Sequence, residues 1–156
     1  MIYALSILVM LYLNHTNQPT THVATKTLDH PLANYDRLAY TDFTEQDIEL
    51  LAKIIMHECG AEWCGDEMKY NTGYVVLNRV ASDDFPDTIY DVIYQPGQYS
   101  GVSCIETLEY SDHVYEIAED IILNGVQIPE NVVYQANFVQ GSGIYVQVQN
   151  MYFCYK

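Results

Sequence analysis

The sequence predicts an α+β fold in which helices come first and a small antiparallel sheet comes last. Apolar residues recur at helical spacing up to about residue 124. After Pro129 the pattern changes to short segments that alternate apolar and polar residues. Helices followed by strands are typical of an α+β domain, because a parallel sheet would require the two kinds of element to alternate.

The first predicted helix starts after Thr44 and ends at Gly60. Thr44 is a suitable N-cap, and the acidic residues Glu45 and Asp47 in the first turn favour the helix dipole. Apolar residues three and four positions apart form one face of this helix. They are Ile48, Leu51, Ala52 and Ile55. The same face continues to Glu58, so we expect this carboxylate to point toward the core.

The later elements follow from the same two patterns. A second helix is predicted over 70–81, and a loop-rich stretch with Phe85-Pro86 and Pro96-Gly97 follows it. We expect Asp66 and Glu67 to be solvated loop charges. The remaining predicted elements are a helix over 114–122 that Asn124-Gly125 terminates, strands over 131–138, 144–149 and 151–155, and a turn at 141–143.

The chain divides into three parts. Residues 1–13 are an apolar run without charged side chains, too short to span a bilayer comfortably and long enough for the apolar region of a signal peptide. A cleaved signal peptide and a retained membrane anchor both remain open. Residues 14–40 are polar and are interpreted as a linker, and residues 41–156 as one globular domain. We therefore expect an exported protein, extracellular or associated with the cell wall, and a monomer.

Charge excludes one class of partner. The chain has 21 acidic and 6 basic residues and a formal charge of -15. Such a surface repels the phosphates that a nucleic-acid-binding protein must neutralise. Nucleic acid is therefore not expected as a partner.

Four cysteines form an even set in a chain with an export-like start. The favoured interpretation is two disulfides, Cys59 with Cys64 and Cys104 with Cys154. A structural zinc site is the alternative, although no C-x-x-C spacing is present. Free buried thiols are expected if the protein stays in a reducing compartment.

Glu58 is the leading candidate for catalysis. A carboxylate on an apolar helix face is costly to ionise, so burial should favour the protonated form that a general acid requires. The alternative is a surface glutamate paired with Lys53 or Lys69. His57-Glu58 begins like a zinc-protease helix, but position 61 is Ala61 where the second histidine would stand. No G-x-S-x-G motif is present either, so serine hydrolase chemistry lacks support.

Three motifs together resemble the SleB-type cell wall hydrolase family, which includes spore-cortex-lytic enzymes. The first is Ile55-Met56-His57-Glu58, with Glu62 four residues after the last position. The second is the segment 75–80, VVLNRV, and the third is the segment 89–100, IYDVIYQPGQYS. Weaker similarity continues through 132–134, 137–138 and 150–153, so the resemblance extends from about Asp47 to the C-terminus.

This resemblance implies a lysozyme-like fold, related to lytic transglycosylases, with a groove between the helices and the sheet. It also implies cleavage of the bond between N-acetylmuramic acid and N-acetylglucosamine in peptidoglycan, by hydrolysis or by formation of an anhydro ring. Glu58 would protonate the leaving oxygen and then act as the base. No metal or cofactor is needed for this chemistry.

Five further residues are candidates for substrate binding. Glu62 would position the substrate or tune Glu58, with a structural or surface role as its alternative. Gln98 and Tyr99 could contact N-acetyl groups and sugar faces, or simply shape the loop around Pro96-Gly97. Asn78 is expected to bond backbone groups and so position that loop. Tyr134 is the tyrosine most suited to line the groove, because its ring is flat and apolar and carries a hydroxyl.

Two departures from the family pattern stand out. The segment between Glu58 and Asn78 is about two residues longer than usual and contains Cys64, and Asn150 is followed by Met151 where the family has histidine. The main alternative function is a non-catalytic, disulfide-stapled glycan-binding domain at the cell surface, since a shared fold does not guarantee activity. An exported peptidase ranks last, because it lacks a metal triad and a nucleophile pair.

Overall fold

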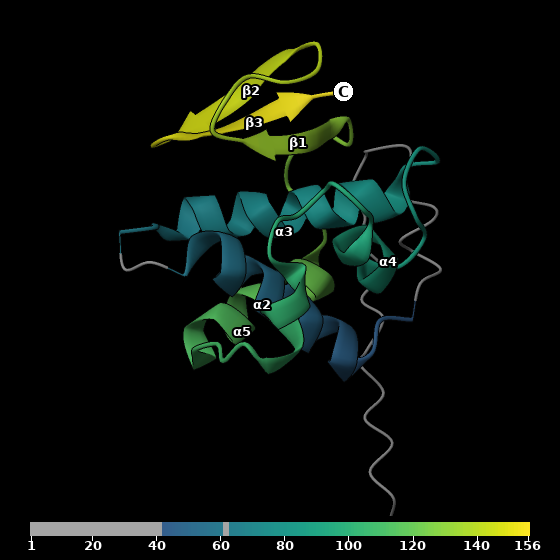
Figure 1. Ribbon diagram of the computed structural model, residues 1–156, viewed down its shortest axis with the longest axis vertical. Coiled ribbons are helices and arrows are strands. Elements are labelled where there is room, and N and C mark those ends of the chain that lie inside the picture. Colours follow the sequence, from purple (N-terminus) through teal and green to yellow (C-terminus); the bar gives the residue numbers. More distant parts are fainter. Residues whose placement is uncertain (1–41, 61–62) are drawn as a thin grey trace, which may run out of the picture.

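The computed structural model describes residues 42–60 and 63–156. The predictions for 1–13, for the linker and for Glu62 lie outside these residues. The elements, in chain order, are helices α2 (Glu45–Cys59), α3 (Asp66–Ala81) and α4 (Ile89–Tyr94), the 3-10 helix η1 (Val102–Thr107), helix α5 (Asp112–Asn124), and strands β1 (Val132–Ala136), β2 (Gly143–Val148) and β3 (Met151–Tyr155). Helices precede a three-stranded antiparallel sheet (Figure 1), so the predicted α+β class is confirmed.

Helix α2 has the bounds that the sequence predicts. The Thr44 hydroxyl accepts a bond from the Asp47 backbone N–H, and the Asp47 carboxylate accepts one from the Thr44 N–H at 2.9 Å. This capping box satisfies N–H groups that the first turn leaves without helical partners. Every apolar position predicted for the core face is buried. The helix ends at Gly60, so Glu58 lies in its last turn.

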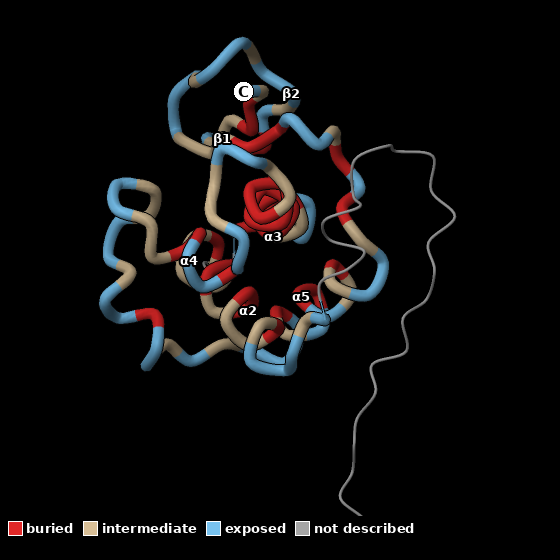
Figure 2. The backbone as a smooth tube through the Cα atoms, turned by 90° about the vertical axis from the view of Figure 1, so that its right-hand side faces the viewer, coloured by how far each residue is buried: buried red, intermediate tan, exposed pale blue. Residues whose placement is uncertain are grey.

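Helix α3 lies at the centre of the molecule. Figure 1 places it between the sheet and the layer of α2 and α5. Every residue of α3 from Asn71 to Val80 is buried, and Figure 2 shows the helix end-on as a mostly red coil. Close packing is possible because Gly73 faces α5: a Cβ there would lie 2.5 Å from Cδ1 of Ile121 and 3.1 Å from Cδ1 of Ile55. The first distance is shorter than van der Waals contact allows, so a side chain at this position would require the end of Ile121 to move.

The predicted start of α3 at residue 70 is wrong, because the helix begins at Asp66. Gly65 is its N-cap and contributes no side-chain hydrogen bond, so the sequence lacks the usual polar cap. Asp66 and Glu67 are exposed, as expected, but they lie in the first turn and not in a loop. Negative charge in that position is favourable with respect to the helix dipole.

The loop-rich stretch after α3 contains two short helices that the sequence analysis did not predict. Thr88 caps α4, its hydroxyl accepting from the Asp91 backbone N–H at 3.0 Å. Helices α4 and η1 have six residues each, which is too short for a helical period to appear. Between them the chain turns through Gly101, whose φ of 72° favours glycine.

The sheet has the strand order β1-β3-β2, and both pairs are antiparallel. It is joined to α3 by two consecutive residues. The Asn78 amide donates to the carbonyl oxygens of Pro129 and Val132, both at 2.9 Å, and Arg79 Nε donates to the carbonyl oxygen of Val133 at 2.7 Å. These bonds fix where β1 starts relative to the helix.

All four cysteines are free in the structure. The predicted Cys104–Cys154 disulfide is wrong here because Cys104 is exposed on η1, whereas Cys154 is buried in β3. Cys59 and Cys64 are both buried but unbonded, and the Cys59 thiol lies 3.1 Å from the Thr72 hydroxyl. Burial, opposed in part by this hydrogen bond, raises the pKa of Cys59 to about 12.

No helix in 42–60 or 63–156 has the length and apolarity that crossing a membrane requires.

Candidate active site

Glu58 lies in the last turn of α2 with its carboxylate partly accessible to solvent. Its side chain is 21% exposed, so it is neither fully buried, as the apolar face suggests, nor a free surface group. The Nδ1 atom of His57, the preceding residue, lies 3.0 Å from Glu58 Oε1. Lys53 and Lys69, the surface partners considered above, instead donate to the carbonyl oxygens of Glu106 and Cys64.

The second carboxylate oxygen of Glu58 faces the sheet. Gln135 on β1 directs its Nε2 toward Glu58 Oε2 at 3.5 Å, at the long end of hydrogen-bonding distance. The other amide atom of Gln135, Oε1, is covered from solvent and has no hydrogen-bond partner within 42–60 and 63–156. The two oxygens of Glu58 therefore face residues from different parts of the chain, one from its own helix and one from β1.

Tyr99 lies within electrostatic reach of the same carboxylate. Burial raises the pKa of the Tyr99 hydroxyl, the nearby Arg79 guanidinium lowers it, and the charge of Glu58 raises it. The Arg79 guanidinium carbon lies 5.1 Å from the centre of the Tyr99 ring, a cation–π distance. The Tyr99 hydroxyl oxygen and Arg79 Nη1 are covered and lack hydrogen-bond partners among the described residues.

The loop after α4 packs against His57, the residue that precedes Glu58. A Cβ on Gly101 would lie 3.3 Å from Nε2 of His57, so the backbone of this loop packs against the histidine ring. The segment that contains Tyr99 and Gly101 is the third motif of the sequence analysis and its continuation. It therefore lies beside His57 and Glu58 at the end of α2.

The other predicted site residues lie in different surroundings. Asn78 is buried, with 1% exposure, and its amide donates to the carbonyl oxygens of Pro129 and Val132 at the start of β1. Gln98 is half-buried in that loop, where its backbone N–H donates to Gln95. Tyr134 precedes Gln135 on β1, and neighbouring strand residues point to opposite faces. Its ring carbons lie near Gly141, where an added Cβ would be 2.8 Å away.

The structure thus brings together Glu58, His57, Tyr99, Arg79 and Gln135. Gln135 and Arg79 were not predicted from the sequence as members of this group. Arg79 is within the second motif, so that motif was an available signal. Gln135 is adjacent to Tyr134 on β1. Which of the two lies at the site depends on which face of β1 meets the helices.

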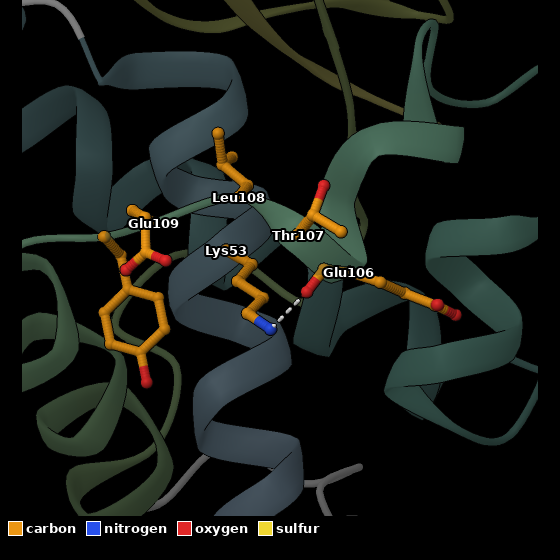
Figure 3. Close-up of a pocket in the computed structure, with 6 residues that line it drawn as sticks. Lys53, Glu106, Thr107, Leu108 and Glu109 are labelled. Atoms are coloured by element: carbon orange, nitrogen blue, oxygen red, sulfur yellow. Dashed lines mark hydrogen bonds between the residues drawn. The ribbon is translucent and has the colours of Figure 1, made fainter.

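A separate hollow lies between α2 and η1 (Figure 3). Its volume is about 330 Å³, and Lys53 Nζ crosses it to the carbonyl oxygen of Glu106 at 2.9 Å. Its lining residues are Lys53, Glu106, Thr107, Leu108, Glu109 and Tyr110. None of them makes a hydrogen bond to Glu58 among the described residues, so this hollow is distinct from the site above.

Comparison with known protein families matches residues 65–154 to Cell Wall Hydrolase, which is more than half of the chain. The chain belongs to the Cell Wall Hydrolase family. No curated protein and no solved structure matches it. The matched segment runs from the N-cap of α3 into β3 and includes Arg79, Tyr99 and Gln135.

Membership makes this cell wall hydrolase an enzyme that acts on the cell wall, and it indicates peptidoglycan as the substrate. Glu58 lies on the helix before the matched segment. Its role therefore rests on the geometry of the site, in which Gln135 of the matched segment faces Glu58 and Tyr99 lies within electrostatic reach of it.

Proposed function

We propose that this cell wall hydrolase is a peptidoglycan glycosidase of the SleB type, in which Glu58 is the general acid and base. The observation that carries the proposal is the placement of Glu58. Its carboxylate is partly exposed at the end of a buried helix, with His57 Nδ1 at 3.0 Å from one oxygen and Gln135 Nε2 at 3.5 Å from the other. A catalytic acid needs both access to substrate and a fixed orientation.

The proposed reaction cleaves the bond between N-acetylmuramic acid and the next N-acetylglucosamine. Protonated Glu58 gives its proton to the glycosidic oxygen while the bond from that oxygen to the muramoyl C1 breaks. Positive charge develops on the ring, and the resulting Glu58 carboxylate lies close enough to stabilise it. Glu58 then takes a proton from the incoming nucleophile, which restores the acid for the next turnover.

The nucleophile distinguishes two forms of the reaction. If the muramoyl O6 hydroxyl attacks C1, its proton passes to Glu58 and an anhydro ring forms. If water attacks, its proton passes to Glu58 and a reducing end forms. His57 and Gln135 are the side chains that hydrogen-bond Glu58 in the described parts of the chain. We assign both proton transfers to Glu58, as the family resemblance implies, and we favour the anhydro-forming route.

Substrate contacts are assigned by position. Tyr99 and Gln98 are on the loop beside Glu58, and we propose that they contact the bound sugars there. Asn78 supports the site by holding β1 against α3. Tyr134, on the other face of β1, and Glu62, outside the described residues, remain predictions as substrate-binding residues. We further propose that the protein is exported as a monomer and that residues 1–13 act as its signal peptide or membrane anchor.

Mass spectrometry of reaction products tests the proposal. The protein from residue 41 onward is incubated with purified peptidoglycan, and the soluble fragments are analysed with and without borohydride reduction. Fragments with anhydro-muramic acid ends, which reduction leaves unchanged, are expected. Fragments with reducing muramic acid ends would show that the enzyme hydrolyses the bond and does not form the anhydro ring. An absence of glycan fragments would contradict a glycosidase and favour the glycan-binding alternative.

A further inference from the structure

Gln135 is the residue through which the sheet contacts Glu58. An ionised carboxylate has only hydrogen-bond acceptors, so the amide of Gln135 must turn its NH₂ group toward it. That orientation agrees with the 3.5 Å distance from Gln135 Nε2 to Glu58 Oε2. It also directs the amide oxygen, Oε1, away from Glu58. The Nε2 atom of Gln135 therefore donates to the Glu58 carboxylate, and its Oε1 atom is left to accept a hydrogen bond from another group.

The acceptor atom of Gln135, Oε1, has no partner in the part of the chain that the structure describes. Oε1 is covered from solvent and receives no hydrogen bond from the described residues. Such a polar atom is unfavourable, since it has lost its hydration without gaining a donor in return. A ligand that brings an N–H or O–H group to this point removes the penalty. Peptidoglycan sugars carry both groups, as acetamido N–H and hydroxyl donors.

The position of Gln135 on β1 is fixed by the core. Its cross-strand partner is Phe153 on β3, which is fully buried. Residues paired across antiparallel strands point to the same face. Phe153 belongs to the main hydrophobic core, whereas Cys154, the partner of Tyr134, is buried outside it, so Gln135 points to the core side of the sheet. A one-residue slip would exchange the faces and move the phenylalanine out of the core. The amide is thus held on a strand whose register the core specifies.

We propose that Gln135 is a positioning and substrate-binding residue of the glycan site. Its Nε2 orients the carboxylate of Glu58, and its Oε1 accepts a hydrogen bond from an acetamido N–H or hydroxyl of the bound glycan. The assignment rests on the proposed glycosidase function. It adds to that function a residue that hydrogen-bonds the sugar beside the scissile bond. It also explains why a polar side chain occupies the core-facing side of β1.

The first test compares Gln135→Met with Gln147→Met. Methionine keeps the length of glutamine but can neither donate to Glu58 nor accept strongly from a sugar. Gln147 is an exposed glutamine on β2, so its replacement controls for the same substitution in the same sheet. We expect Gln135→Met to lower kcat/KM for glycan release by roughly tenfold to a hundredfold, the size of a lost hydrogen bond to a charged group. Gln147→Met should match the wild type.

A second variant separates positioning from a general loss of structure. Gln135→Glu places a second carboxylate beside Glu58, and the pair should hold a shared proton to higher pH. The alkaline limb of the pH–rate profile is therefore expected to move to higher pH in Gln135→Glu. A purely structural role would lower the rate at every pH without moving the limb, which would contradict the proposed contact with Glu58.

Glycan affinity tests the acceptor side alone. In the Glu58→Gln background, which is expected to be inactive, Gln135→Met should weaken binding of a soluble glycan oligosaccharide by about tenfold. Equal affinity would overturn the proposed bond from Oε1. If the wild type releases fragments and Gln135→Met releases them equally fast, this inference fails and the glycosidase proposal stands. If the wild type releases none, both fail.

Discussion

The side-chain amide of Asn78 on α3 donates a 2.9 Å hydrogen bond to the carbonyl oxygen of Val132 at the start of β1. Three residues further along this strand is Gln135, which faces Glu58 across the site. The position of the sheet over the helices therefore determines the surroundings of the catalytic candidate, although Asn78 itself is buried.

Replacement of Asn78 by alanine should destabilise the whole fold. The change removes the donor for two buried carbonyl groups, those of Pro129 and Val132, and should lower the free energy of unfolding by about 2–4 kcal/mol. Urea unfolding followed by circular dichroism measures this. Asn71→Ala is the control, because Asn71 is also buried on α3 but its side-chain amide donates within its own helix, to the carbonyl oxygen of Glu67. Equal losses in both variants would contradict the role of Asn78 as the link to the sheet.

Thiol reactivity should differ sharply among the four cysteines. Cys104 is exposed, whereas Cys59, Cys64 and Cys154 are buried. Burial also raises the pKa of Cys59 to about 12, so almost none of it is the reactive thiolate at neutral pH. We expect one thiol to react quickly with Ellman's reagent in the folded protein, and all four to react after denaturation. Fewer than four in the denatured, unreduced protein would reveal a disulfide that this structure lacks.

The carboxylate of Asp66 should titrate at lower pH than usual. Hydrogen bonds from His113 and then from Lys69 lower its pKa below the ordinary 3.8. A depressed folded-state pKa means that the stabilisation is present above 3.8 and is lost as the pH falls through the folded value. The effect is small because the Asp66 side chain is half-exposed. NMR titration of the Asp66 carboxyl should show its midpoint rising toward 3.8 in His113→Ala, and an unchanged midpoint would exclude His113 as the cause.

Local signals explain which parts of the fold could be predicted. Helix α2 has a polar cap, a complete apolar face and a terminal glycine, all within one short segment. The start of α3 was missed because Gly65 caps it without a side-chain bond. Helices α4 and η1 were missed because neither is long enough to display a helical period.

Only the site residues that belong to short sequence motifs could be predicted. Glu58 and Tyr99 belong to short motifs, so they could be chosen as candidates from the sequence. Gln135 contacts Glu58 across a separation of 77 residues, and that contact depends on the register between β1 and β3. Alternation alone could not decide whether Tyr134 or Gln135 faces the helices. Phe153, opposite Gln135, lies in the main hydrophobic core, whereas Cys154, opposite Tyr134, is buried outside it, and this difference became visible only with the strands paired.

The activity of Glu58→Gln tests the central claim most directly. Glutamine keeps the shape of the side chain but has no acidic proton to give, so the fold should be retained. Glu45→Gln is the control, since Glu45 is an exposed glutamate in the first turn of the same helix. Release of soluble glycan fragments from peptidoglycan should fall by about a hundredfold or more in Glu58→Gln and stay at the wild-type rate in Glu45→Gln. Wild-type release by a folded Glu58→Gln protein would contradict the assignment of Glu58 as the catalytic acid.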